Sequence, residues 1–514
     1  MKVRKLFSCF MALLLLMLTL AACDGGVEPS TSSSSGDTAS ADSQPAEEKD
    51  IGDYVEKKDY GGRTLTILSP RMNAENKSET EYMKNEYADN YEGEKLATRI
   101  NDAIEARNHL VEEYLNVQIV EQRLHETSRP GGAMLQTVRT EIIVGGSTTY
   151  QLINPCLYDC GTLAAEGSLY NLYSNSTLNG LEAEWWDHTF NGDVSFGDKL
   201  YFTNGDMGFQ SKSSTAIVVF NRDLQTEYGL EDPYALVREG TWTIDKAIEM
   251  AKNISEDLNG DGQITYEDKV GWEGQADDCW NMFYSSGSRI AEFDADGKLQ
   301  LTMYAERSAR AAERIMELVQ DDAHYISAND YFSVTQWPVE LCMENFAAGN
   351  ALFFSDSLGS LINFQKMKGN YGLLPIPKLD EAQDEYQSFI NPWVSSALCI
   401  PSSLPMEDAE FAGAVLECMG YYSMDTVRRE YHDEVLSYQY VQDDESMEML
   451  ELILNTRGCD VGQIFQVGNY QNTLHEFATM DPGSFRSAYE ASAGAAQEDL
   501  LREAVLADDE AVML

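Results

Sequence analysis

Residues 214–255 read STAIVVFNRDLQTEYGLEDPYALVREGTWTIDKAIEMAKNIS, and this stretch decides the fold. Its apolar run at 216–220 is rich in β-branched residues and predicts a buried strand. Residues 241–255 predict a helix that Thr243 caps, with Asp245 in its first turn. A buried strand followed by a helix is the repeating unit of an α/β fold.

The same alternation extends along the chain in both directions. On the N-terminal side we expect strands at Thr64–Leu68, Val117–Val120 and Tyr150–Ile153, separated by helices at 93–115 and 133–143. On the C-terminal side we expect a helix at 305–320, strands at Ala351–Phe354, Tyr371–Pro375 and Ala397–Ile400, and a mostly helical stretch at 406–514. This order predicts the α/β class with parallel sheets.

The N-terminus has the pattern of an export signal. Basic residues in 1–5 precede an apolar run, 6–20, which is too short to favour a membrane span. The run ends in Leu-Ala-Ala-Cys23, which resembles a bacterial lipobox, where the peptide is cut before the cysteine and the thiol receives the lipid. An ordinary secretory signal is the alternative. We expect a signal peptide at 1–22, a flexible tether at 23–58, and a lipid-anchored protein on the extracellular face of the cell membrane.

Composition narrows the classes of partner. A chain of 514 residues has room for two large lobes or about three domains. The formal net charge of −50 repels phosphates, so we expect no nucleic acid partner. Apart from Cys9 and Cys23, seven cysteines remain, mostly in apolar contexts, and we expect buried free thiols.

Residues 257–268, DLNGDGQITYED, resemble the calcium loop of an EF-hand. Calcium takes six to eight oxygen ligands from a short loop whose alternate positions converge, and Gly262 permits its sharp turn. We expect the ligands to come from Asp257, Asn259, Asp261, Gln263, Thr265 and Asp268. No second loop pairs with it, so we interpret it as a structural Ca²⁺ site. A solvated acidic turn is the alternative.

Catalytic motifs are mostly missing from the sequence. The six histidines form no HExxH motif, and neither a GxSxG elbow nor a GxxxxGK[ST] phosphate loop occurs. The 86 acidic residues make any chosen carboxylate pair uninformative about glycoside cleavage. We therefore assign no catalytic residue.

Several motifs together are similar to those of the bacterial extracellular solute-binding proteins of family 1, the carbohydrate-binding lipoproteins of ABC transporters. They are Phe220-Asn221, Trp242-Thr243-Ile244-Asp245, the helix in 93–117, the element 344–351 and the return strand 370–377. Their order and spacing carry the resemblance, which spans about 60–500. Some members of that family carry a Trp where this chain has Leu358, which weakens the transfer of any particular sugar.

The resemblance implies two discontinuous Rossmann-like lobes joined by a hinge, as in type II periplasmic-binding proteins. The first lobe would comprise 59–210 and 374–425, and the second 211–373 and 426–514. It further implies a monomeric receptor, not an enzyme, that binds a carbohydrate between the lobes and delivers it to the permease subunits of an ABC importer.

Ligand-binding residues follow from the family pattern and from the rule that open α/β sheets bind ligands at the carboxyl ends of their strands. We expect them at Arg71, Asn154, Asp206, Asp277, Asp278, Trp280, Tyr284, Asp356, Ser357 and Trp393. Aromatic rings suit the apolar face of a sugar, and carboxylates and amides suit its hydroxyls.

Other functions stay open at this point. The lipoprotein signal and calcium loop also fit a surface glycan-active enzyme or an adhesin. Within the receptor class, the ligand can instead be a peptide, a polyamine or a metal, because Asp277 and Asp278 suit a cation.

Overall fold

The computed structural model describes residues 50–71, 87, 99–126, 128–364, 367, 369–432 and 443–504. Contacts divide the chain into two units, Met1–Lys49 and Asp50–Leu514, and the description below concerns the second. The predicted signal peptide, Cys23 and most of the predicted tether lie outside the described residues. Within the described ranges, no helix combines the length and apolar character needed to cross a bilayer.

The packed part of the chain begins before residue 59, where the sequence placed the end of the tether. Asp50 caps a short 3₁₀ helix, η1 (Ile51–Asp53), and the side chains of Ile51 and Val55 are buried in the core. These two apolar residues gain more from burial than from exposure in a tether.

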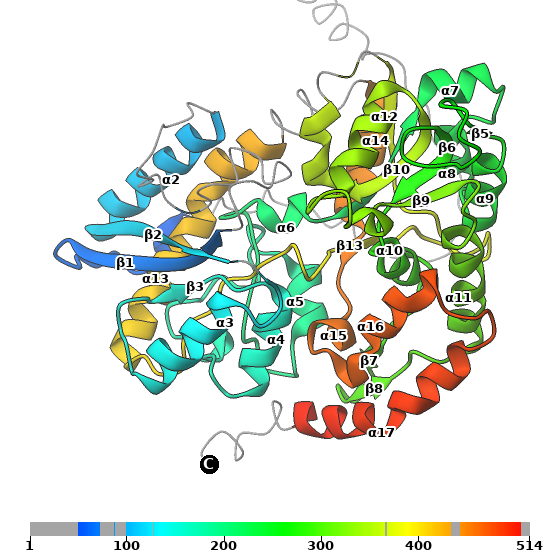
Figure 1. Cartoon of the computed structure of the whole chain (residues 1–514). Helices are drawn as coiled ribbons and strands as arrows, with labels where there is room; N and C mark the ends of the chain where they lie inside the picture. Colours follow the sequence, from blue (N-terminus) through cyan, green and yellow to red (C-terminus); the bar gives the residue numbers. More distant parts are fainter. Residues whose placement is uncertain are drawn as a thin grey trace, which may run out of the picture. The chain divides into compact units, whose positions relative to one another are not determined.

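The first sheet has three parallel strands in the order β2-β1-β3 (Figure 1). Its strands are β1 (Arg63–Arg71), β2 (Val117–His125) and β3 (Leu152–Ile153). Residues 65–70 of the central strand β1 are all buried, as expected for a parallel strand covered on both faces. The parallel pairing brings the carboxyl ends of β1 and β2 to one edge.

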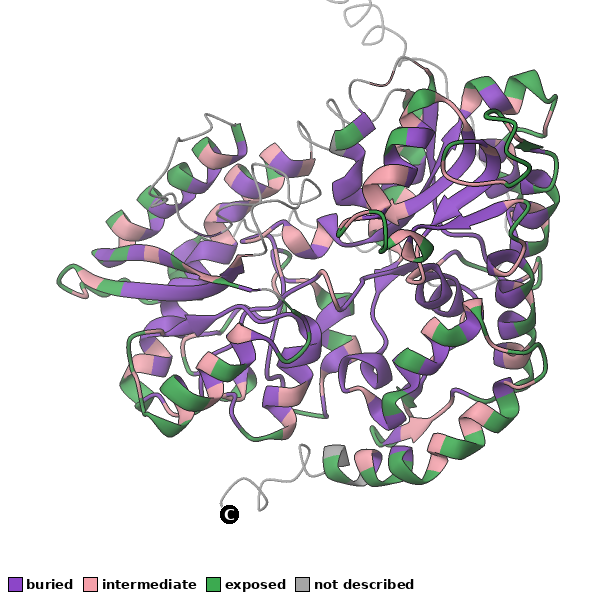
Figure 2. Cartoon of the chain, in the orientation of Figure 1, coloured by how far each residue is buried: buried purple, intermediate pink, exposed green. Residues whose placement is uncertain are grey.

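The second sheet is mixed, in the order β11-β4-β10-β6-β5, with β9 also paired to β6 (Figure 1). Its strands are β4 (Ala216–Asn221), β5 (Ser255–Glu256), β6 (Lys269–Gly274), β9 (Tyr325–Ser327), β10 (Ala351–Ser357) and β11 (Tyr371–Leu374). Every residue of β4 is buried (Figure 2). However, β4 runs antiparallel to both β10 and β11, so the predicted parallel pairing holds here only for β6, β9 and β10.

Two smaller pairs of strands complete the sheets that the structure describes. The hairpin β7 (Ala291–Phe293) to β8 (Leu299–Leu301) turns at Gly297, whose φ of 74° suits a residue without a side chain. Strands β12 (Ser388–Phe389) and β13 (Arg457–Gly458) pair in parallel.

Helices cover these sheets, and most of them match the predicted segments. The described α-helices are α2 (Arg99–Leu115), α3 (Ala133–Thr137), α4 (Leu157–Ala165), α5 (His188–Val194), α6 (Gln210–Ser213), α7 (Arg222–Glu227), α8 (Pro233–Glu239), α9 (Ile244–Ala251), α10 (Asp278–Ser285), α11 (Glu306–Val319), α12 (Val339–Ala348), α13 (Met406–Ser423), α14 (Asp444–Asn455), α15 (Val461–Ile464), α16 (Tyr470–His475) and α17 (Phe485–Ala504). The shorter 3₁₀ helices are η4 (Leu172–Ser174), η5 (Ala328–Tyr331), η6 (Leu358–Phe364), η9 (Val467–Asn469) and η10 (Glu476–Ala478), and the π-helices are η3 (Val138–Val144) and η7 (Met424–Arg428). The predicted cap of α9 is confirmed, because Thr243 Oγ1 accepts a hydrogen bond from Lys246 N at 3.3 Å.

The predicted strand Ala397–Ile400 does not form as a regular strand. Its residues make isolated bridges instead, Leu398 with Thr203 and Cys399 with Ile153. The segment is fully buried, which explains its strand-like apolar sequence, but its hydrogen bonds are divided between different neighbours.

Free cysteines are confirmed within the described residues. All seven cysteines there are buried and unpaired by disulfides. The Sγ atoms of Cys160 and Cys399 are 3.7 Å apart, well beyond a disulfide bond of about 2.05 Å.

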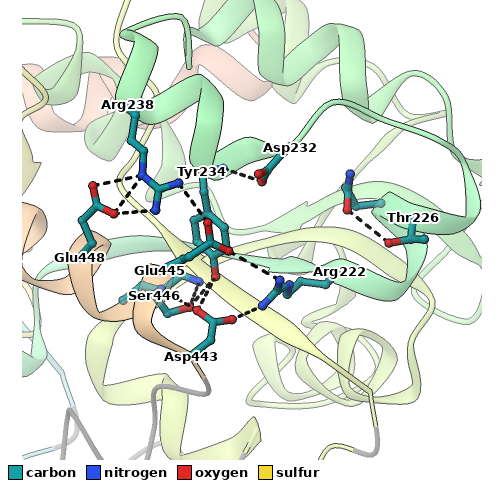
Figure 3. A network of polar contacts seen from close by, with 11 residues as sticks. Arg222, Thr226, Asp232, Tyr234, Arg238, Asp443, Glu445, Ser446 and Glu448 are labelled. Atoms are coloured by element: carbon teal, nitrogen blue, oxygen red, sulfur yellow. Dashed lines mark hydrogen bonds and ion pairs between the residues drawn. The ribbon is translucent and has the colours of Figure 1, made fainter.

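A polar network holds helix α14 against the second sheet (Figure 3). Asp443 caps α14, accepting hydrogen bonds from Ser446 N at 2.7 Å and from Tyr234 Oη at 3.3 Å, and it forms an ion pair with Arg222. Arg238 on α8 pairs with two glutamates of α14. Helix α14 therefore docks on residues that precede it by more than 200 positions.

Candidate functional site

One cavity of about 430 Å³ lies where the strands of both sheets end. Pro70 of β1 and Arg123 of β2 reach it from the first sheet. From the second sheet come Ser355–Ser357 at the end of β10 and Gln275 directly after β6. The carboxyl ends of strands are where open α/β sheets bind ligands, so this cavity is the candidate site.

Uncharged polar side chains and aromatic rings dominate the lining. The residues are Pro70, Arg123, Arg129, Gln210, Ser213, Ser214, Ala216, Gln275, Asp277, Asp278, Trp280, Asn281, Asn329, Phe332, Gln336, Trp337, Pro338, Val339, Ser355, Asp356, Ser357, Gly359, Ser360, Asn391, Trp393, Val394 and His475. Six of the ten predicted ligand-binding residues are among them: Asp277, Asp278, Trp280, Asp356, Ser357 and Trp393.

The aromatic side chains of the cavity are held in different ways. Trp280 donates from Nε1 to Gln471 O at 2.7 Å, and the imidazole of His475 stacks on its ring. Trp393 donates from Nε1 to Arg129 O at 2.9 Å. The indole Nε1 of Trp337 has no hydrogen-bond partner, which leaves a donor at the cavity for a ligand.

Two of the three cavity aspartates are held by hydrogen bonds from several side chains. Asp277 accepts from Asn391 Nδ2 at 2.7 Å, and its Oδ1 lies 3.0 Å from His475 Nε2. Asp278 Oδ2 accepts from Ser355 Oγ, from Tyr325 Oη and from the indole of Trp272. Burial nevertheless raises the pKa of Asp278 to about 7.

Asp356 differs from these two aspartates because its hydrogen-bond donors all come from the neighbouring residue, Ser357. Ser357 N donates to its Oδ1 at 2.7 Å. Burial, together with the nearby charge of Asp277, raises the pKa of Asp356 to about 7. Of the three carboxyl groups, this one alone has no hydrogen bond from a residue outside its own strand.

The wall formed by the first sheet carries the positive charge. Arg129 donates from Nη1 to the carbonyls of Trp393 and Val394, each at 3.3 Å, while its buried Nε has no partner. Its charge lowers the pKa of two neighbouring carboxyl groups, Glu126 and Asp159, although burial raises both overall. Arg129 thus has acidic neighbours of its own.

Two predicted site residues serve other contacts outside the cavity lining. Asp206 forms ion pairs with Lys212 at 2.7 Å and with Arg428 at 3.2 Å. Tyr284 is buried on α10, one turn past Trp280, and the guanidinium of Arg289 covers its ring at 3.4 Å. Positions four apart share one face of a helix, so the spacing from Trp280 does not exclude Tyr284 from the cavity; its ring packs instead against Phe389 and Arg289.

The other two predicted residues lie in or beside the first sheet, also outside the cavity lining. Arg71 is the last residue of β1 and aligns with His125 of β2. Asn154 follows β3, is buried, and donates its backbone N–H to Leu68 O at 2.8 Å.

Sequence reasoning missed Arg129, Trp337, Asn281 and His475. His475 comes from α16, far along the chain from Asp277, and no sequence spacing brings them together. Asn281 is three residues from Asp278 and next to Trp280, so helical spacing alone was enough to find it.

The predicted calcium loop forms a tight, exposed turn. Asp257 accepts from the backbone N–H groups of Gly260 and Gly262 at 2.6 and 2.8 Å, and both glycines have positive φ. Asp268, which is buried, accepts from Leu258 N and Thr265 N at 2.8 and 2.9 Å and so closes the loop. Among the described residues, no three His, Cys, Asp or Glu side chains gather closely enough to hold a metal ion. Calcium binding stays a prediction.

Comparison with known proteins gives a match in fold alone. No family model matches the sequence, and no curated protein matches it. Among solved structures, the ABC substrate-binding protein Lmo0181 from Listeria monocytogenes, in complex with cycloalternan, has 13% identity and a TM-score of 0.54, covering 85% of this chain and 99% of that chain.

Two further solved structures match this chain in fold. The maltose-binding periplasmic protein MalE from Listeria monocytogenes has 11% identity and a TM-score of 0.51, covering 86% of this chain and 98% of its own. UgpB from Mycobacterium tuberculosis, in complex with glycerophosphocholine, has 14% identity and a TM-score of 0.53, covering 78% of this chain and 95% of its own. The predicted α/β fold class is confirmed, and the chain shares the fold of these three solved structures.

Proposed function

We propose that this protein is a solute receptor that binds a carbohydrate, specifically an oligosaccharide, in the cavity and delivers it to an ABC importer. One observation carries the proposal: the cavity lies at the strand ends of both sheets and combines aromatic rings with uncharged polar side chains. Solved structures of the same fold hold cycloalternan and maltose, which supports a sugar as the class of ligand.

The cavity suits the chemistry of sugar recognition. The volume of about 430 Å³ is within the usual range of about 300–1,000 Å³ for ligand pockets. The rings of Trp393 and Trp337 offer faces for the C–H surface of a pyranose, and the amides of Asn391 and Gln210 offer donors and acceptors for its hydroxyls. Each hydrogen bond to a charged group, such as Asp356, contributes about 1.5–3 kcal/mol.

We also propose two discontinuous lobes, 59–210 with 374–425 and 211–373 with 426–514, that close on the ligand about a hinge. Three features support this division. The first sheet uses strands between 63 and 153, α13 packs against α2, and α14 packs against β11 of the second sheet. Closure of such lobes would exclude water from the cavity.

The location and partners are part of the same proposal. Cys23 would carry a lipid that anchors a monomeric receptor on the extracellular face of the cell membrane, next to the permease subunits. The formal net charge of −50 supports the view that nucleic acid is not a partner.

We further propose that Ca²⁺ binds the loop 257–268 as a structural ion. The oxygen donors fit a hard cation, and the turn already has the backbone conformation that Gly260 and Gly262 permit. The residues that would hold the ion are Asp257, Asn259, Asp261, Gln263, Thr265 and Asp268.

Thermal unfolding of the full-length protein in detergent tests the receptor function. A ligand that binds only the folded state raises the stability by RT ln(1 + [L]/Kd). We expect a rise with particular oligosaccharides, each recovered intact afterwards. Recovery of cleaved sugar would favour a glycan-active enzyme, and a rise with peptides or polyamines alone would change the class of ligand.

A further inference from the structure

The wall of the cavity formed by the second sheet is acidic and carries no Lys or Arg. Asp277, Asp278 and Asp356 line it, and His475 is their sole basic neighbour among the lining residues of that wall. His475 pairs with Asp277, and three side-chain donors surround Asp278. Within the described residues, no ion pair joins Asp356 to any cation.

An independent polar group on the same wall has no partner. Asn281 is 4% exposed and lines the cavity, and its Oδ1 accepts no hydrogen bond. A buried acceptor without a donor is costly, so its presence at a cavity points to a donor on the ligand. Asn281 and Asp356 therefore offer acceptors, and neither offers a positive charge.

We propose that the ligand carries a protonated amine and that the carboxylate of Asp356 binds it, with Asn281 as a further acceptor. The inference rests on the proposed carbohydrate function and makes its substrate class an amino sugar. A polyamine presents the same ammonium group and is the other source of this chemistry. An ammonium donates up to three hydrogen bonds and offsets the repulsion between Asp356 and Asp277, which a neutral hydroxyl does not.

Charge around Asp356 is consistent with this assignment. Burial holds the pKa of Asp356 at about 7, so without a cation beside it this carboxyl group is partly protonated at neutral pH. The charge of Asp277 acts on it, and Asp278 and His475 also line the cavity. Arg123 and Arg129 line the cavity too, each with acidic neighbours of its own, Glu121 for the first and Glu126 and Asp159 for the second. A cation at Asp356 favours its charged form, so binding near neutral pH releases protons.

Isothermal titration of the full-length protein in detergent tests the proposal at neutral pH, where Asp356 is partly ionised and the amine is largely protonated. The probes are glucose di- to tetrasaccharides in α-1,4 and β-1,4 linkage, their 2-amino-2-deoxy counterparts, the N-acetylated forms of these, and the polyamines putrescine and spermidine. We expect an amino saccharide to bind at least about tenfold tighter than its neutral counterparts.

The variant Asp356→Asn removes the charge and keeps an acceptor for Ser357 N, so it should fold. We expect it to abolish the preference for the amine, whereas Asp322→Asn, an exposed carboxylate outside the cavity, leaves the preference unchanged. Neutral sugars that bind as tightly as amino sugars would overturn the inference and leave the receptor function standing. Binding of polyamines alone would keep the ammonium site and refute the carbohydrate function, and no binding by any amine would overturn the inference.

Discussion

The imidazole of His475 lies flat on the indole of Trp280, with the ring centroids 4.0 Å apart and the planes 8° from parallel. One face of Trp280 is therefore already covered, so this residue cannot offer that face to a ligand. His475 also reaches Asp277 at 3.0 Å, which makes it the link between an aromatic ring and a carboxylate of the cavity.

Replacing His475 by alanine should weaken ligand binding about two- to tenfold, because an aromatic pair is worth about 0.5–1.5 kcal/mol. Affinity falls because the ring of Trp280 loses the imidazole stacked on it, and because Asp277 keeps only its hydrogen bond from Asn391. Titration calorimetry with the best-stabilising saccharide measures it. The matched variant His324→Ala, whose imidazole pairs with Asp321 outside the cavity, should keep the parent affinity. Equal losses in the two variants would contradict the role given to His475.

Trp393 should act as a ligand contact, and Trp242 as a core residue. Trp393→Ala is expected to weaken binding by about tenfold or more, as for a buried aromatic anchor in a cavity. Trp242 is fully buried and donates to Pro375 O at 2.9 Å, so Trp242→Phe should lower the free energy of unfolding and leave affinity unchanged. Parallel measurements of affinity and thermal unfolding separate the two. If Trp393→Ala keeps full affinity, the sugar does not lie on that wall.

The buried carboxyl group of Glu273 should make the stability of the protein depend on pH. It is fully buried, its Oε1 accepts from Asn345 at 2.8 Å, and its Oε2 has no partner. Burial raises the pKa of Glu273 well above the usual 4.5. The folded protein therefore holds a proton that the unfolded chain has released, and stability falls as pH rises from 4.5 towards the folded pKa.

Glu273→Gln removes this loss, so the stability of the variant relative to the parent should grow with pH, by up to about 1.4 kcal/mol per pH unit. Urea unfolding at a series of pH values measures the difference. The exposed Glu313→Gln serves as the control and should show no such trend. A parent and a Glu273→Gln variant with parallel pH profiles would show that Glu273 is ionised in the fold.

The network at α14 allows a comparison of a half-buried and an exposed charge pair (Figure 3). Asp443→Ala removes a helix cap and the partner of Arg222, and should cost about 1–2 kcal/mol of stability. Glu448→Gln breaks an exposed pair with Arg238 and should cost under about 1 kcal/mol. Chemical unfolding of both variants checks the order. A larger loss for Glu448→Gln would contradict it.

Calcium should raise the unfolding temperature of the parent protein, and a chelator should reverse the rise. Asp257→Ala should abolish the response, because Asp257 occupies the first position of the loop and accepts two of its backbone N–H groups. The hairpin variant Asp296→Ala, in a similar acidic turn, should respond as the parent does. An unchanged unfolding temperature with calcium would reduce the loop 257–268 to a solvated turn.

The sequence was informative where a local pattern decides the structure. The apolar run of β4 and the cap at Thr243 are local signals, and both appear as predicted. Strand direction is not local: β4 pairs antiparallel with β10, although it reads like any buried parallel strand. The predicted strand at 397–400 was wrong for the same reason. Burial alone explains the apolar character of these residues, and they form no continuous strand pairing.

The prediction of the cavity lining was limited in the same way, to residues with a local signal. Asp356 was found because it follows a strand that the apolar pattern locates, whereas Asp277 and Trp280 were found by their position in the family pattern. His475 and Arg129 reach the cavity through tertiary packing from distant segments, and a single sequence holds no signal for that.

Equilibrium titration of the full-length protein with the best-stabilising oligosaccharide, followed by analysis of the recovered sugar, tests the central claim most directly. The account predicts saturable binding of one ligand per chain, binding weakened by about tenfold or more in Trp393→Ala, and sugar recovered intact. Absence of saturable binding by every oligosaccharide, or recovery of a cleaved product, would contradict a carbohydrate receptor.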